Sequence, residues 1–196
     1  MSRSTMLVLL ACVALAGANA AFAHAPKTRT TQLELFGVPL KGATRTELRA
    51  ALTKTALKPT RIDDHYIADE YDPSGVLDGA SKLVVAYTDD ATQRFADAEY
   101  TFQTFMDTTL VTKVERMVAT KYGPPDHRSG SPNLGSVDYR WDFPGGMMIE
   151  VHRGWPDVTT YLDYVDKRAN AKLNAELAAD KAKRERAKAK AESSAF

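Results

Sequence analysis

The sequence predicts an α+β domain, with two short helices on one face of an antiparallel sheet and an extended helix at the C-terminus. Three observations favour this class. Several short segments alternate apolar and polar residues with the period of a half-buried strand, while two others repeat apolar residues with the period of a helix. Beyond Asp166 the composition changes abruptly, and the strong helix formers Lys, Ala, Arg and Glu dominate.

The clearest strand signals lie in the last third of the domain. Residues 137–143 alternate apolar and polar side chains, and the Pro-Gly-Gly at 144–146 then allows the chain to reverse tightly. Residues 147–152 resume the alternation. A second break at 154–157 leads into residues 158–165, so we expect three consecutive antiparallel strands here.

The first half of the domain contains the same kinds of segment. Residues 33–38 predict a short strand, and Thr44-Arg45-Thr46-Glu47 matches a capping box, in which Thr44 and Glu47 satisfy each other's backbone amides. The helix that begins there carries apolar residues at helical spacing and is expected to end at Pro59. Further strands are predicted at residues 65–71, 83–87 and 96–103.

A second helix is predicted between these strands and the last three. Asp107 is its expected cap, and Gly123, which two prolines follow, is its expected end. We interpret residues 127–136, rich in Ser, Gly, Pro and Asn, as a loop. The apolar stripe of the helix comprises Leu110, Val111, Val114, Met117, Val118 and Tyr122.

The domain spans residues 33–166 and divides into two similar halves, 33–101 and 99–166. Each half has a strand, a capped helix and about three strands, which predicts a duplicated structural unit. The tail, residues 167–196, has only Leu173 and Leu177 as large aliphatic residues and six basic residues near its end. We expect this Lys/Ala-rich tail to be an exposed helix or a disordered segment.

Residues 1–23 match a signal peptide. Arg3 supplies a positive start, residues 6–16 an apolar run and Ala21-Phe22-Ala23 a cleavage site, although a cut after Ala20 also remains open. The apolar run is shorter than the roughly 20 residues that span a membrane. The mature chain would therefore begin with a flexible lead-in at residues 24–32 and have no transmembrane segment.

Composition points to an exported protein without disulfides. The one cysteine, Cys12, lies inside the signal peptide, so the mature domain must be stabilised by its core alone. Removing Arg3 leaves 25 Lys and Arg against 25 Asp and Glu, so no overall charge indicates nucleic-acid binding. We expect a bacterial periplasmic or secreted protein.

The sequence predicts no catalytic residues, no metal ligands and no cofactor. Its four histidines lack metal-site spacing, and it has neither a nucleophile elbow nor a phosphate-binding glycine loop. Two alternatives remain open. Carboxylates of residues 63–72 could act with His65 or His127 in a hydrolase, and His24 at the mature N-terminus could bind copper or zinc.

The segment after the predicted strand at 147–152 is the best candidate for a binding surface. His152, Arg153 and Trp155 lie together in or beside a tight loop, and Trp beside Arg is a frequent anchor of protein interfaces. The alternative is that Trp155 folds back over the sheet, because large aromatic side chains bury area where they can. An anchor requires that Trp155 be largely exposed.

Phe36-Gly37-Val38-Pro39-Leu40 before the first helix, and Lys121-Tyr122-Gly123-Pro124 at the end of the second, resemble segments of small exported α/β modules. These modules include the BamE/SmpA family of outer-membrane assembly lipoproteins and the β-lactamase-inhibitor-protein fold, which duplicates such a module. This chain differs from the first in lacking a clear lipobox and from the second in lacking disulfide cysteines. The resemblance implies a non-catalytic, protein-binding or envelope-accessory role, in one version inhibitor-like, and transfers no site residues.

Overall fold

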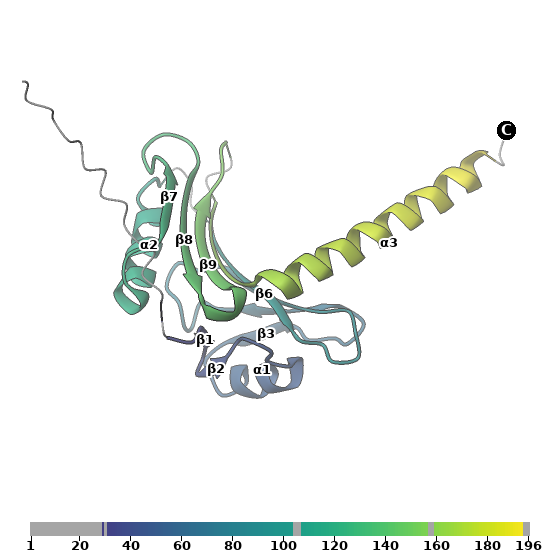
Figure 1. Ribbon diagram of the computed structural model, residues 1–196, viewed down its shortest axis with the longest axis horizontal. Coiled ribbons are helices and arrows are strands. Elements are labelled where there is room, and N and C mark those ends of the chain that lie inside the picture. The colour runs from purple at the N-terminus through teal and green to yellow at the C-terminus, as the bar shows by residue number, and fades with distance from the viewer. Residues whose placement is uncertain (1–28, 30, 104–106, 157–158, 194–196) are drawn as a thin grey trace, which may run out of the picture.

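An eight-stranded antiparallel sheet, in the order β3-β4-β5-β6-β10-β9-β8-β7, organises the chain (Figure 1). The computed structural model describes residues 29, 31–103, 107–156 and 159–193. The strands are β3 (Lys58–Arg61), β4 (Ala68–Asp72), β5 (Lys82–Tyr87), β6 (Phe95–Phe102), β7 (His127–Gly130), β8 (Val137–Phe143), β9 (Met147–Arg153) and β10 (Thr160–Asp166). A short 3₁₀ turn, Pro144–Gly146, joins β8 to β9 as the Pro-Gly-Gly sequence predicts.

The sheet consists of two similar four-stranded halves. Helix α1 (Arg45–Leu52) precedes the meander β3 to β6, and helix α2 (Leu110–Tyr122) precedes the meander β7 to β10. The halves join where β6 pairs with β10. The prediction of about three strands per half is one strand short, because the edge strands β3 and β7 are mostly exposed and therefore show no apolar alternation. Strand β7 occupies a segment that the sequence predicted as loop.

The capping box of α1 is confirmed. The Thr44 hydroxyl accepts a hydrogen bond from the Glu47 amide at 3.3 Å, and the Glu47 carboxylate accepts one from the Thr44 amide at 2.8 Å. The predicted end at Pro59 is wrong, since α1 ends at Leu52 and Pro59 lies in β3. Proline is tolerated there because β3 is an edge strand, whose backbone need not donate on both sides.

Two predicted strands differ in their boundaries. The segment at 33–38 forms a small hairpin, β1 (Glu34–Leu35) against β2 (Val38–Pro39), instead of one strand. Its turn holds Phe36 and Gly37 at φ values of 50° and 78°, a region that glycine adopts without strain. The strand predicted at 65–71 begins only at Ala68.

Helix α2 ends at Gly123 as predicted, with a φ of 80° and a hydrogen bond from its amide to the Ala119 carbonyl at 2.8 Å. Its start differs from the prediction. The Asp107 carboxylate accepts hydrogen bonds from the amide and the hydroxyl of Thr109, at 2.8 and 2.6 Å. Thr109 is therefore the residue before the helix, which begins at Leu110 without a side-chain cap. Met117 is 39% exposed and not part of the buried stripe.

Helices α1 and α2 pack on one face of the bent sheet, as the sequence predicts, and α3 (Lys167–Ser193) leaves from the opposite, concave face (Figure 1). The core lies between the sheet and the two short helices. It includes the inward-facing residues of β8 and β9, with Trp141, Ile149 and Val151 fully buried. Among the described residues, only the first turns of α3 cover the concave face.

The tail is helical from Lys167 to Ser193. Asp166 caps α3 by accepting hydrogen bonds from the amides of Arg168 and Ala169, both at 3.1 Å. Salt bridges connect the first turns to both halves of the sheet, Lys172 to Asp90 at 2.7 Å and Lys167 to Asp142 at 2.6 Å. No helix within the described ranges is both long and apolar enough to cross a membrane.

Leu173 is the one residue of α3 that is buried, with 3% exposure, among the residues described. Leu173→Ala is expected to lower the free energy of unfolding by about 2–3 kcal/mol, because a cavity replaces the packed side chain. Chemical denaturation measures this loss. Leu177→Ala, at a site that is 46% exposed, is the matched control and should change stability by less than about 0.5 kcal/mol. Equal effects of the two changes would contradict the anchoring role of Leu173.

Candidate functional site

The centre of the concave face carries carboxylates in direct cross-strand register. Glu99 on β6 lies opposite Asp163 on β10, and Asp163 lies opposite Glu150 on β9. Asp138 on β8 is diagonal to Glu150 and hydrogen-bonded to it. Like charges directly opposite each other destabilise a sheet. The fold alone therefore gives no reason for this arrangement, which we call the acidic row (Glu99, Asp163, Glu150 and Asp138).

The surroundings of the acidic row favour the protonated form of two of its acids, Glu150 and Glu99. Protonated Glu150 donates a hydrogen bond to the Asp138 carboxylate, and this bond together with partial burial raises the pKa of Glu150 to about 7. Burial and the charge of Asp163 raise the pKa of Glu99. On the same face, burial and the charges of Asp163 and Glu99 raise the pKa of Asp97 to about 8. At neutral pH the concave face therefore holds protons that a nearby cation would displace.

Two cationic groups lie beside the acidic row, Arg140 directly opposite Glu150 on β8 and His152 next to Asp163. The His152 Nδ1 lies 3.1 Å from Asp163 Oδ2, and the imidazole ring stacks on Tyr161 with the centroids 5.0 Å apart. The Asp163 carboxylate beside it raises the pKa of His152, against the opposing effect of burial. His152 thus compensates only part of the negative charge and remains 37% exposed at its side chain.

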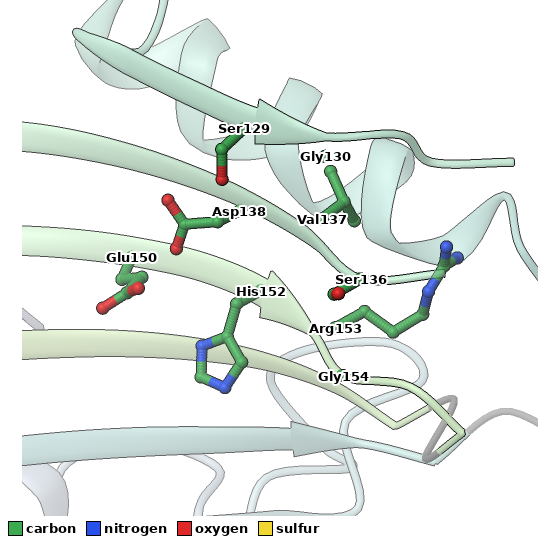
Figure 2. A pocket seen from close by; sticks show the side chains of 9 residues that line it. All are labelled: Ser129, Gly130, Ser136, Val137, Asp138, Glu150, His152, Arg153 and Gly154. Carbon is green, nitrogen blue, oxygen red and sulfur yellow. The ribbon is translucent and has the colours of Figure 1, made fainter. Parts of the chain in front are cut away.

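An open groove of about 380 Å³ lies beside the acidic row, between the ends of β7, β8 and β9. Figure 2 shows Asp138, Glu150 and His152 around it, with Ser129 on the neighbouring strand. The groove has carboxylate, hydroxyl and imidazole groups within one surface. It suits a ligand that brings positive charge and hydrogen-bond donors.

The sequence-predicted residues His152, Arg153 and Trp155 separate in the structure. His152 lies on the concave face, and Trp155 is 70% exposed in the β9–β10 loop, which meets the requirement for an anchor. Leu134, in the β7–β8 loop at the same end of the sheet, is 81% exposed and was not predicted. A lone Leu in a Ser/Gly/Pro loop gives no signal in the sequence.

Arg153 is buried, which corrects its prediction as a surface residue. Its guanidinium donates to the carbonyls of Thr108 at 3.1 Å, Pro132 at 2.7 Å and Gly135 at 2.9 Å. Figure 2 shows its side chain directed away from that of His152. Successive residues of a strand face opposite sides, and Arg153 continues the buried series Met147, Ile149, Val151. Arg153 therefore positions the loop that carries Leu134.

The acidic segment at 63–72 is largely engaged in ion pairs. Asp69 has no exposed surface and accepts hydrogen bonds from Arg45 at 2.6 Å and from Arg49 at 2.7 and 2.8 Å. Burial acts to raise the pKa of Asp69, but Arg49 and Arg45 outweigh it and hold the pKa below its usual value. Asp64 pairs with Arg49 at 2.7 Å. This arrangement stabilises the packing of α1 on β4.

Of the two histidines named with that segment, His65 stays beside it and His127 lies far away. His65 is an exposed loop residue, and its imidazole pairs with Asp63 at 2.7 Å. His127 lies on β7, six inter-strand spacings from Asp69 on β4, or roughly 29 Å along the sheet. Within the described ranges, no group of three or more His, Cys, Asp or Glu side chains could hold a metal ion. His24 and the predicted signal peptide lie outside the described residues.

Comparisons with known proteins give little guidance. No protein-family model matches the chain, and a search of curated proteins finds no match. Among solved structures, the chain is similar to the crystal structure of a DUF4309 family protein, YjgB, from Bacillus subtilis subsp. subtilis str. 168. The identity is 17%, the match covers 69% of this chain and 88% of that chain, and the TM-score is 0.38. A similarity of this size carries no conclusion about fold or function.

Proposed function

We propose that this is an exported, non-catalytic protein whose concave sheet face binds a basic segment of another envelope or extracellular protein. The observation that carries the proposal is the acidic row, in which Glu99, Asp163 and Glu150 lie directly opposite one another on three adjacent strands. Export rests on the predicted signal peptide. An inhibitor-like role, as the resemblance implies, is a specialised form of the same proposal.

A cationic partner would resolve the electrostatic conflict of this face. Lys or Arg side chains placed among the carboxylates would replace repulsion by attraction and lower the raised pKa of Glu150, which is about 7 in the free protein. Charge-assisted hydrogen bonds to carboxylates are among the strongest that proteins form. The free energy of binding would therefore include the loss of the repulsion between carboxylates that is present in the free protein.

Exposed apolar residues at the end of the concave face support a macromolecular partner. Trp155 and Leu134 are 70% and 81% exposed, and they lie in the two loops that border this end of the sheet. Large apolar side chains beside a charged groove are typical of interface anchors. Arg153 joins these loops through its bonds to Pro132 and Gly135, so the anchors are held by the folded sheet.

Carboxylates of raised pKa also occur in enzymes as proton donors. The protonated Glu150 and its neighbour Asp138 belong to an open groove on a sheet face, not to an enclosed cavity that excludes water. In the segment 63–72, the carboxylates of Asp63, Asp64, Asp69 and Glu70 are ion-paired instead. Binding is thus the function that this geometry supports best, and we propose no second function.

The direct test uses a fluorescent peptide of eight lysines as probe. The mature protein should bind it, and E99Q/E150Q/D163N should weaken binding at least about tenfold, since each lost charge pair in such a groove is worth about 1 kcal/mol or more. Affinity should rise as the pH is raised from 6 to 8.5, because the cation binds the deprotonated form of Glu150, whose pKa is about 7. Binding should weaken with added salt.

The matched control is D78N/D180N/E192Q, which removes the same number of carboxyl groups from exposed acids elsewhere. Equal loss in both triple variants would show that only net charge matters and would overturn the proposed site. Crosslinking in native cell envelopes then identifies the partner. A partner that wild type and control retain, and that E99Q/E150Q/D163N and W155A both lose, would support the interface.

A further inference from the structure

A second candidate site, independent of the proposed function, lies on the opposite face of the sheet. Because α1 and α2 each cover their own half, the seam between β6 and β10 is left partly open on the core face. A groove of about 340 Å³ remains there, with Tyr100, Leu162 and Tyr164 among its lining residues. We propose that this seam groove binds a small amphiphile with an apolar chain and an oxygen-containing head group.

Tyrosine hydroxyls make the seam groove unlike an ordinary packing gap. The Tyr122 hydroxyl is buried and has no hydrogen-bond partner among the described residues. The rings of Tyr100 and Tyr164, which also line the groove, meet edge to face with centroids 6.4 Å apart. Burial raises the pKa of Tyr100 and Tyr164, so both are neutral phenols. Buried polar groups without partners require an explanation, and a ligand oxygen supplies one.

The walls of the seam groove are apolar and adaptable. Phe36 from the β1–β2 hairpin, Leu77 from the loop before β5 and Val118 from α2 line it, while Val76 and Met117 are 40% and 39% exposed nearby. Methionine has a flexible, polarisable side chain that fits varied apolar shapes. These walls suit a hydrocarbon chain, which would remove Val76 and Met117 from water.

Size and charge limit the ligand further. A cavity of about 150 Å³ holds benzene, which has six non-hydrogen atoms. The groove of about 340 Å³ therefore holds a ligand of about twelve non-hydrogen atoms. The groove is lined by one cation, Lys121, and one anion, Glu34, so net charge of the head is not the selecting feature. The phenols instead select a hydroxyl, carbonyl or carboxyl oxygen.

Octan-1-ol and octanoate are suitable probes, because they share an eight-carbon chain and differ in the charge of the oxygen head. Titration of the ¹⁵N-labelled mature protein should give saturable shift changes at the groove residues with either probe. Tyr122→Phe should weaken binding about fivefold, the value of one hydrogen bond. Met117→Trp should fill the groove and abolish binding. Tyr139→Phe, a tyrosine outside the groove, is the matched control and should leave binding unchanged.

Three results would overturn the proposal: no saturable shifts with either probe, shifts spread over the whole surface, or binding that Met117→Trp does not change. The E99Q/E150Q/D163N variant separates this proposal from the proposed function. It should bind both probes as wild type does while losing the lysine peptide. If the peptide fails to bind wild type but octan-1-ol binds, only the proposed function is refuted.

Discussion

Replacing Asp69 with alanine is expected to lower the free energy of unfolding by about 3–5 kcal/mol, the usual result of leaving one member of a buried ion pair unpaired. Arg45 is 2% exposed and would lose its carboxylate partner at 2.6 Å. Its remaining hydrogen bonds, to the carbonyls of Tyr66 and Asp63 at 2.9 and 3.0 Å, cannot neutralise its charge. Urea denaturation at pH 7 measures the effect.

Asp64→Ala provides the control on the same cluster. Asp64 is 76% exposed and pairs with Arg49 at 2.7 Å, so its removal should cost less than about 1 kcal/mol. The loss of unfolding free energy for Asp69→Asn should lie between those for Asp69→Ala and Asp64→Ala, because the amide fills the space of the carboxylate but carries no charge. A loss for Asp69→Ala no larger than that for Asp64→Ala would show that the buried network contributes little to stability. It would also reopen the question of why these carboxylates gather at α1.

The contrast between Asp69 and Glu150 shows what the sequence could predict about function. The acidic segment at 63–72 is conspicuous in the sequence because its residues are neighbours in the chain. The acidic row is not, since Glu99, Glu150 and Asp163 come from strands that lie far apart in sequence. Each of them occupies the polar position of an alternating strand, where a solvated surface is the ordinary expectation. Only the strand order β6-β10-β9 brings them together.

The fold was more accessible to prediction because its signals are local. The Thr44–Glu47 capping box, Gly123 at the end of α2 and the alternation of β8 each depend on residues within one element. The errors fall where local signals are absent or misleading. Pro59 suggested a helix end but lies in an edge strand, and β7, four exposed residues, has no apolar period at all. Whether such segments form strands depends on their pairing with a neighbouring strand of the sheet and not on their local sequence.

The same alternation could have placed Arg153 correctly. It lies in phase with the buried Met147, Ile149 and Val151, whereas His152 is in phase with Glu150. Arg153 was predicted as a surface residue because a charged residue at the end of a strand usually faces solvent, although the alternation of β9 predicts that it is buried. The backbone carbonyls that receive the guanidinium belong to two loops distant in sequence, and no pattern in the sequence predicts them.

Stability is expected to fall as the pH rises through the neutral range, and Asp97→Asn is expected to remove much of this fall. The pKa of Asp97 is raised to about 8 in the folded protein, against 3.8 for an ordinary Asp. Between these values the folded state binds more protons than the unfolded state, so raising the pH favours unfolding. For Asp97 this amounts to about 3–5 kcal/mol between pH 4 and pH 9, at about 1.4 kcal/mol for each pH unit.

Asp97→Asn keeps the shape of the side chain and carries no charge at any pH. Its stability advantage over wild type should be much larger at pH 9 than at pH 5, because the unfolded wild type ionises Asp97 from about pH 4 upward while the folded protein keeps the proton up to about pH 8. Urea denaturation at both values measures the difference. Asp89→Asn, in the exposed loop before β6, should leave the pH profile of wild type unchanged. Parallel profiles for Asp97→Asn and wild type would mean that Asp97 ionises normally. The charge that β6 and β10 bring to the concave face would then be tolerated without cost, and the argument for a cationic partner would lose its main physical support.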